Sequence, residues 1–566
     1  MHGIDESGGG ESVVMGEEDE FYKRCLPSLG HFPRSDASIA VALNELDAML
    51  EAEDGTEEDV SHHSAQHVEK TPSGAQVSTR EQVVGSHPVD FALEFPRICI
   101  VTTASLPWLT GTAVNPALRG AYLWNQGHHV TLLVPWVKRE EQGNLFQKGV
   151  EFDSEKDQLE AVRTSLSARV PFDITWGDEN DENGSGSPRY HIRFYGGKYA
   201  PALGSIIPTQ DIQPLVPQDV SCIVLEEPEH LTWYHSGKRW IRAFDSHVPV
   251  VGVMHTNYVD YARRMAGDAA SVTLKQLNKF LCRQHTHKVI KLSAAVQKLP
   301  REEVCFVHGV SEGFLRIGKS VKAGEVVFEK AAYFLGKALW AKGFEELLDK
   351  MEAHEYVCAQ NGKETIRVDV YGHGKELEEI QNESSTRGLS LNFLGPKDHL
   401  SEDMAAYRVF VNPSTSDVVA TTSAEALAMG KWLLVPSHPC NAFFADFQNC
   451  LVYENDDQFS DMLIHAAHYD PQPLSESEIN RLTWECATDR LLLCCSETTT
   501  ERSKRLGFER VACKTSWLGY NVGYGVYSIV TKAIDSVVGS IQTSQSERVR
   551  GRLRPPNKDG LQSHAL

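Results

Sequence analysis

Residues 97–136 decide the fold, and they read RICIVTTASLPWLTGTAVNPALRGAYLWNQGHHVTLLVPW. The apolar run at 97–103 is typical of a buried strand. A loop follows, and residues 116–125 then predict a helix, which ends just before a glycine. A second buried strand is expected at 129–136. Strand, helix and strand at this spacing predict a βαβ unit of a parallel sheet.

The same alternation continues along the chain in two series, separated by a predicted linker at 319–324. The first series has further expected strands at 190–195, 221–225 and 250–254. The second series has expected strands at 331–335, 367–371, 390–394, 409–411 and 432–435, with helices at 342–352, 375–385, 420–429 and 458–469. We therefore predict an α/β protein with two Rossmann-like domains and a cleft between them.

The length of 566 residues suits two or three domains rather than one core. We divide the chain into an acidic, mostly disordered segment, two Rossmann-like domains, helices that cross back, and an amphipathic helix with a basic tail. These parts are expected at 1–93, 94–320, 325–475, 476–510 and 511–566, respectively.

The charge of the chain excludes a nucleic-acid partner. The net charge is -22, whereas a phosphate backbone requires a basic surface. Residues 1–90 hold 19 acidic and 5 basic side chains, so this segment carries most of the excess. A solvated tail explains the segment, and a regulatory segment is the alternative.

The sequence predicts that any membrane contact occurs at the surface. No apolar stretch is long enough to span a bilayer. The N-terminus lacks the order of a secretory signal, and it is too acidic for an ordinary plastid transit peptide. At the other end, residues 517–541 have apolar side chains at helical spacing and precede a basic run. This pattern predicts either attachment to an anionic membrane or a helix packed on the body.

The stretch AAYFLGKALWAKG at 331–343 is a candidate anion site. A predicted strand delivers Gly336 and Lys337, and Lys342 is expected to open the next helix. Two lysines beside a helix N-terminus suit a diphosphate. The alternative is that both are ordinary surface charges.

The stretch VNPSTSDVVATTSAEALAMG at 411–430 carries two carboxylates eight residues apart. Asp417 falls in a loop and Glu425 on a helix, so together they can bind the hydroxyls of a sugar and of a ribose. The helix start, with Thr422 in its first turn, can also offer backbone N–H groups to phosphate. Glu425 could be an ordinary helix carboxylate, but its alanine and leucine neighbours favour a partnered acid.

Two loops of the first series add candidates. His255 follows the strand at 250–254, at the strand end where open α/β sheets place ligands, although a lone histidine is more often structural. Gly111 and Thr112 lie in the loop after the first strand, where glycine allows close approach to phosphate or simply forms a turn. The missing G-x-G-x-x-G argues against a nicotinamide enzyme. No D-x-D and no cluster of metal ligands occurs, so no metal is expected.

Together these stretches resemble glycosyltransferase family four, which comprises retaining enzymes of the GT-B fold. The resemblance is closer to digalactosyldiacylglycerol synthases and covers roughly 94–490. It is carried by PWLTGTAVNP at 107–116, EEPEHLTWYH at 226–235, HTNY at 255–258, LSAA at 292–295, VHGV at 307–310, YFLGK at 333–337 and AEALAMG at 424–430. One departure is HPCNAFF at 438–444, where Cys440 and Ala442 replace the serine and glutamate of that branch. The loss of the glutamate would remove a charge near the donor cleft.

The resemblance implies transfer of galactose from UDP-galactose to monogalactosyldiacylglycerol, with retention and without a further cofactor. It implies that 325–475 binds the UDP-sugar and that 94–320 meets the acceptor and the membrane. The implied location is the cytosolic side of the chloroplast outer envelope. The alternatives are a nucleotide-sugar transferase with a soluble acceptor and an inactive nucleotide-sugar-binding protein.

The resemblance also implies residue roles. Lys337, Lys342 and the Gly111 backbone would stabilise the diphosphate, with Thr112, Gly336 and Thr422 also in the donor site. Glu425 would hold the ribose. Asp417 would contact galactose hydroxyls, and His255 would touch O6 or the edge of the sugar ring.

A lipid acceptor implies a membrane-facing surface, and the region 258–288 combines aromatic and basic residues. We expect that surface to include Tyr258, Arg263, Arg264, Lys279 and Phe280. The alternative is a helical connection packed on its own domain.

Overall fold

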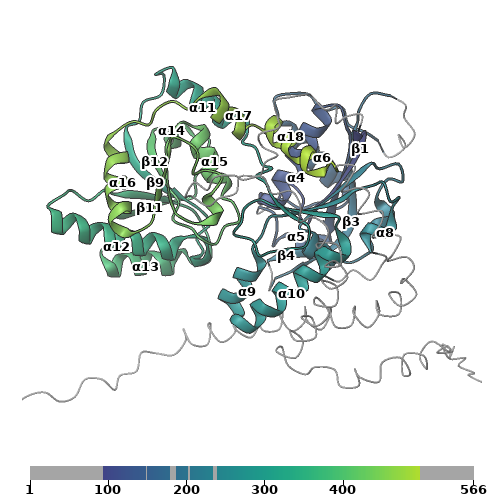
Figure 1. Cartoon of the computed structure of the whole chain (residues 1–566), viewed down its shortest axis with the longest axis horizontal. Helices are drawn as coiled ribbons and strands as arrows, with labels where there is room; N and C mark the ends of the chain where they lie inside the picture. The colour runs from purple at the N-terminus through teal and green to yellow at the C-terminus, as the bar shows by residue number, and fades with distance from the viewer. Residues whose placement is uncertain (1–93, 148, 179–185, 202–203, 234–238, 498–566) are drawn as a thin grey trace, which may run out of the picture.

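The computed structural model describes residues 94–147, 149–178, 186–201, 204–233 and 239–497. Two strand-and-helix domains lie side by side in it (Figure 1). The predictions for 1–93 and 511–566 fall outside the described residues.

The N-terminal domain is built on an eight-stranded sheet. Its strands are β1 (Arg97–Val101), β2 (His129–Val137), β3 (Tyr190–Ala200), β4 (Ser205–Pro208), β5 (Cys222–Glu226), β6 (Val250–Met254), β7 (Lys288–Lys291) and β8 (Glu302–Val304). Their order is β4-β3-β2-β1-β5-β6-β7-β8, and every pair is parallel except β3 with β4. The direction of winding changes between β1 and β5, which is where such sheets open a crevice.

The C-terminal domain contains a six-stranded parallel sheet. Its strands are β9 (Lys330–Leu335), β10 (Val368–Tyr371), β11 (Leu391–Gly395), β12 (Tyr407–Val411), β13 (Trp432–Pro436) and β14 (Cys450–Tyr453). The order β11-β10-β9-β12-β13-β14 is that of a doubly wound dinucleotide-type sheet. The prediction of two Rossmann-like domains is therefore confirmed.

Helices cover both faces of each sheet. In the N-terminal domain they are α4 (Gly111–Asn125), α5 (Arg139–Gln142), α6 (Glu155–Ser167), α7 (Pro228–Thr232), α8 (Trp240–Ala243), α9 (Tyr258–Ala266), α10 (Asp268–His285) and, from the end of the chain, α18 (Trp484–Cys495). In the C-terminal domain they are α11 (Glu312–Lys322), α12 (Phe344–Asn361), α13 (Leu377–Arg387), α14 (Glu402–Ala405), α15 (Thr421–Ala428), α16 (Asp456–His468) and α17 (Glu476–Leu482). Short 3-10 turns occur at η2 (Gln213–Leu215), η3 (Trp340–Lys342) and η4 (Pro439–Asn441).

The central strands are apolar because both of their faces are covered. Along β1, Ile98 and Ile100 pack into one buried cluster, whereas Cys99 and Val101 pack into another on the opposite face. This alternation follows from the two-residue period of a strand. An apolar run without polar alternation is therefore the signature of such a strand.

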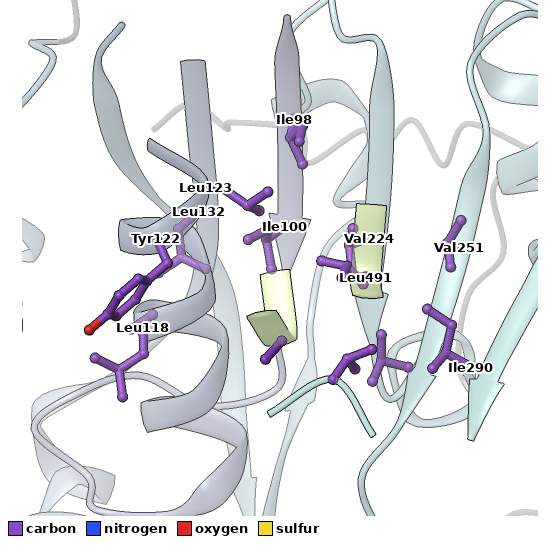
Figure 2. Close-up of a cluster of buried hydrophobic side chains, with 14 of the residues drawn as sticks. Ile98, Ile100, Leu118, Tyr122, Leu123, Leu132, Val224, Val251, Ile290 and Leu491 are labelled. Carbon is purple, nitrogen blue, oxygen red and sulfur yellow. The ribbon is translucent and has the colours of Figure 1, made fainter. Parts of the chain in front are cut away.

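The chain returns to the N-terminal domain after completing the C-terminal one. Helix α18 lies beside α4 (Figure 1). Its Leu491 is buried in the same cluster as Ile98 and Val224 (Figure 2), and its Trp484 stacks on Tyr122 with ring centroids 6.0 Å apart. A fully buried leucine contributes about 1.5–3 kcal/mol, so α18 ties the two domains together.

Helix α4 begins at Gly111, five residues before the predicted start, and Pro116 lies inside it. Proline has no N–H, so it cannot bond to the carbonyl oxygen of Thr112. The Thr102 hydroxyl donates to that oxygen instead. A hydroxyl from the residue just after β1 thus offsets the lost helical bond, which the sequence pattern did not reveal.

Two further boundaries differ from prediction. The expected linker at 319–324 is largely helical, because α11 extends to Lys322. Lys342 ends the turn η3 instead of opening a helix, and α12 starts only after Gly343. Gly343 has a φ of 86°, and a Cβ there would lie 2.9 Å from the Cβ of Ser414. Glycine is required at this position, and the tight turn separates Lys342 from the helix.

Candidate active site

A cavity of about 320 Å³ lies between the two domains. Its walls come from the segments that follow β1, β6, β9 and β12, so it joins the crevices of both sheets. The predicted residues that line it are Gly111, Thr112, His255, Gly336, Lys337, Lys342, Asp417 and Thr422. Seventy or more residues separate some of these positions in sequence, and the fold brings them to one place.

Two helix N-termini, one from each domain, point their first residues at this cavity. Gly111 and Thr112 open α4, whereas Thr421 and Thr422 open α15. Neither helix has a side-chain cap or an acidic residue in its first turn. Uncapped N-termini present amide N–H groups and the positive end of the helix dipole, which favours an anion between them.

Lys342 forms an ion pair across the cavity wall. Its Nζ lies 2.7 Å from Oδ1 of Asp417 and 5.8 Å from the ring centre of Tyr261. Burial opposes the charge, but Asp417 and Tyr261 outweigh it and raise the pKa of Lys342 above its usual value. Lys342 therefore stays cationic at neutral pH, as a diphosphate partner must.

His255 is bonded to a buried carboxylate behind it. Its Nε2 lies 2.5 Å from Oε2 of Glu226, the last residue of β5. The other oxygen of Glu226 accepts from Nε of Arg119 at 2.7 Å. Arg119 and Glu226 are both 0% exposed. Burial would raise the pKa of Glu226, but Arg119 and His255 lower it below its usual value.

A second buried carboxylate, Glu227, ties together the loops around the cavity. Its Oε2 accepts from Thr103 at 2.8 Å and from Tyr258 at 3.0 Å, and its Oε1 accepts from Thr256. Glu227 has a φ of 65°, a left-handed conformation that costs energy for a residue other than glycine. Glu227 therefore joins the segment after β1 to the segment after β6.

Glu425 is a partnered acid, although it is not among the residues lining the cavity. Its Oε2 lies 2.6 Å from Nδ1 of His399, and Nε2 of His399 lies 2.7 Å from the hydroxyl of Tyr333. Burial and the Glu425 carboxylate raise the pKa of Tyr333 well above its usual value, so its hydroxyl remains a donor. The expectation that the apolar setting of Glu425 requires a partner is confirmed.

The prediction that aromatic side chains of the region 258–288 face the membrane is wrong. Phe280 is only 7% exposed, and Leu277 and Leu281 are also buried. The hydroxyl of Tyr258 points inward, towards Glu227 and His230. The apolar stripe of α10 packs against its own domain, so these side chains are not available to lipid.

The basic residues of that region lie nearer to solvent. Arg263 and Arg264 both bond to Asp260, and Arg264 also reaches Glu346 of the C-terminal domain at 3.6 Å. The side chain of Lys279 is partly buried. Arg264 therefore takes part in an interdomain contact beside the cavity.

The departures at Cys440 and Ala442 lie on η4 and just after it. The thiol of Cys440 is buried beside Ser414 and His438, whereas Ala442 is exposed. Ala442 does not line the cavity described above. Within the described part of the chain, no group of three or more His, Cys, Asp or Glu residues is placed to hold a metal ion.

Several residues at the site were missed by the sequence predictions. These are Arg119, Glu226, Tyr261, His308 and His399. The sequence contains one sign of the role of Glu226: it is an acid at the end of an apolar strand, and such an acid needs a buried partner. The partners lie on other elements, so only the folded chain identifies them.

Comparisons with known proteins agree with this architecture. Residues 329–468 match a family model described as glycosyl transferases group 1. Digalactosyldiacylglycerol synthase 2, chloroplastic, of Arabidopsis thaliana is 41% identical over 402 residues, which are 70% of this chain and 80% of that protein. Digalactosyldiacylglycerol synthase 1, chloroplastic, of Glycine max is 40% identical over 427 residues, 73% of this chain and 52% of that protein. The chain thus spans about half the length of the synthase 1 relatives.

Solved structures that are similar to this chain include HepE of Anabaena in complex with UDP and glucose. The TM-score is 0.38 and the identity is 12%, over 74% of this chain and 98% of that chain. For sucrose-phosphate synthase from Thermosynechococcus elongatus, the TM-score is 0.39 and the identity is 13%. This match covers 76% of this chain and 99% of that chain.

Two doubly wound domains, a cationic cleft between them and the matching family model define a glycosyltransferase of the GT-B class. The chain belongs to the digalactosyldiacylglycerol synthase family. The relatives are named as chloroplastic, and no helix among the described residues is long and apolar enough to cross a bilayer.

Proposed function

We propose that this protein transfers galactose from UDP-galactose to monogalactosyldiacylglycerol, with retention, to make digalactosyldiacylglycerol. The observation that carries the proposal is the interdomain cavity, where two uncapped helix N-termini and two lysines converge. Family membership supports the choice of donor and acceptor, since relatives are named as digalactosyldiacylglycerol synthases.

In this proposal, the cavity stabilises the leaving diphosphate. Lys337 and Lys342 supply positive charge, and the amide groups of Gly111 and Thr112 lie at the opposite helix N-terminus. These fixed donors neutralise the charge that develops as UDP leaves. Preorganised charge of this kind usually supplies the largest part of catalysis.

The Lys342–Asp417 pair is proposed to open when the donor binds. The diphosphate competes with Asp417 for Lys342, because both are anions within reach of one ammonium group. Asp417 is then free to accept bonds from galactose hydroxyls. His255 lines the same cavity from the N-terminal domain, and in this proposal it contacts the same sugar.

Retention is proposed to proceed by front-side attack. The bond from the anomeric carbon to the diphosphate oxygen breaks, while the 6-hydroxyl of the acceptor galactose forms a new bond on the same face. The proton of that hydroxyl passes to the leaving diphosphate oxygen. This route needs no carboxylate nucleophile on the opposite face of the sugar.

The acceptor is a lipid, so we propose that the mouth of the cleft meets the cytosolic face of the chloroplast outer envelope. The side chain of Arg263 is 58% exposed on α9, the helix that also carries Tyr261 of the cavity. Basic side chains near the cleft would favour an anionic membrane surface.

We also propose that His399 holds Glu425 for the ribose of UDP. His399→Phe keeps a ring among the aromatic neighbours Phe314, Tyr333 and Phe410, but it removes the bond to Glu425. A hydrogen bond to a charged group contributes roughly 1.5–3 kcal/mol, so UDP binding should weaken about 10- to 100-fold in titration calorimetry.

His465→Phe is the matched control for that variant, because His465 is an exposed histidine stacked on Tyr469, away from the cavity. Equal UDP affinities for the two variants would show that His399 does not act on the nucleotide site.

The transfer reaction itself is tested with purified protein, labelled UDP-galactose and liposomes containing monogalactosyldiacylglycerol. We expect a labelled digalactosyl lipid, resolved by thin-layer chromatography. Label appearing only on an added soluble sugar would favour the alternative acceptor class. Binding of UDP-galactose without any transfer would favour an inactive binding protein.

A further inference from the structure

We propose that Glu226 is a positioning residue that fixes the proton of His255 on Nε2, and so makes Nδ1 an acceptor for a hydroxyl of the donor sugar. The inference rests on the proposed function, because it assumes that a nucleotide sugar occupies the cavity. It adds a residue that lies behind the cavity wall and does not itself touch the sugar.

Glu226 is held in one orientation by buried partners. Its carboxylate is fully buried at the end of β5, and Arg119 donates to Oε1 at 2.7 Å. Arg119 is fixed in turn, since its Nη1 donates to the carbonyl oxygen of Val307 at 2.7 Å. The carboxylate therefore has a set orientation, with Oε2 presented to His255.

The proton between Glu226 and His255 lies on the histidine. Burial opposes the charge of Glu226, but the Arg119 guanidinium keeps the pKa of this carboxyl below its usual value, so the group is a carboxylate at neutral pH. A carboxylate only accepts hydrogen bonds. His255 Nε2, 2.5 Å from Oε2, must therefore be the nitrogen that carries the proton.

The His255 ring is also held in place by a second histidine. His308 stacks on His255, with centroids 5.1 Å apart and planes inclined by 24°. Burial lowers the pKa of His308 well below its usual value, so the stacked partner is uncharged. His308 therefore restrains the plane of the His255 ring without competing for Glu226 as a cation.

These restraints leave one ring nitrogen for a ligand. The His255 ring lines the cavity, its Nε2 is engaged by Glu226, and no bond to its Nδ1 is present among the residues that the structure describes. A neutral ring with its proton on Nε2 has a lone pair on Nδ1. That lone pair selects a hydroxyl donor, whereas the opposite tautomer would present an N–H and select an acceptor.

The most direct test uses the wild-type protein with 15N-labelled histidines. The His255 signals are assigned as those lost in His255→Gln, and their shifts report which nitrogen carries the proton. We expect a neutral ring protonated on Nε2, with Nδ1 moving when UDP-galactose is added but not when UDP is added. A ring protonated on Nδ1, or on both nitrogens, would overturn the inference.

A variant test asks whether Glu226 acts through His255. Glu226→Gln keeps the shape of the side chain but can donate to Nε2, which would move the ring proton to Nδ1. We expect UDP-galactose to bind about 10- to 100-fold more weakly, with UDP affinity unchanged. In a His255→Gln background, Glu226→Gln should have little further effect. Additive losses would mean that Glu226 has only a structural role.

Glu302→Gln is the matched control, since Glu302 also accepts from a buried cation, Lys291, but lies outside the cavity lining. It should leave the affinity for both ligands unchanged. If Glu226→Gln fails to fold, the wild-type spectrum still decides the question. Because these readouts are binding and protonation, they stand even if no galactolipid is formed, so the two proposals fail separately.

Discussion

Lys342→Ala is expected to lower the rate of galactosyl transfer about 100- to 1000-fold, which is the usual cost of removing one preorganised charge from a reacting centre. Lys342 lines the cavity beside the α15 N-terminus and stays cationic through its pairing with Asp417. Its side chain is 33% exposed, so truncation leaves no buried gap and the fold should survive. Transfer from UDP-galactose to liposomal acceptor, with thermal unfolding in parallel, measures both effects.

Lys350→Ala is the matched control for this variant. Lys350 also pairs with an aspartate, Asp456, but it lies on α12 and does not line the cavity. We expect near-normal turnover from Lys350→Ala. Near-normal turnover from Lys342→Ala as well would remove Lys342 from the mechanism.

Arg119→Ala is expected to destabilise the N-terminal domain by about 3–5 kcal/mol, because it leaves the Glu226 carboxylate buried in the core without its cationic partner. Both side chains are fully buried, and Arg119 also bonds to the Val307 carbonyl, which would lose its donor. The midpoint and slope of denaturant unfolding give the change in the free energy of unfolding.

Arg139→Ala serves as the comparison, since Arg139 pairs with two carboxylates, Glu151 and Asp153, on an exposed surface. Solvent screens such pairs, so little change in stability is expected. Equal stability of the Arg119 and Arg139 variants would contradict the role assigned to the buried pair.

Much of the fold was predictable because a parallel sheet covered on both faces needs apolar strands. The runs at β1, β2, β6 and β9 have few polar residues, and their spacing allows a helix between them. The short strands β4, β7, β8 and β14 were not predicted. They have three or four residues each, which is too short for a periodic signal.

The candidate site was predicted as a set of segments, but not as a set of contacts. The lysines, Asp417 and His255 follow strand ends, and strand ends meet at one edge of a parallel sheet. The Lys342–Asp417, His255–Glu226 and Glu425–His399 bonds join residues 75, 29 and 26 positions apart. No local pattern encodes such pairings, so the sequence could not supply them.

The error at α10 has a related cause. Helical periodicity shows that Leu277, Phe280 and Leu281 share a face, but it does not show what that face meets. In the structure the face packs on its own domain. A basic and aromatic composition therefore predicted a membrane surface where the apolar side chains of α10 form core.

The anomeric configuration of the outer galactose tests the central claim most directly. The lipid formed from UDP-galactose and monogalactosyldiacylglycerol would be purified and its anomeric proton coupling measured by NMR. We expect an α-linked outer galactose, which requires retention of the donor configuration and agrees with front-side attack. A β-linked outer galactose, or no digalactosyl lipid at all, would contradict the proposed function of this cleft.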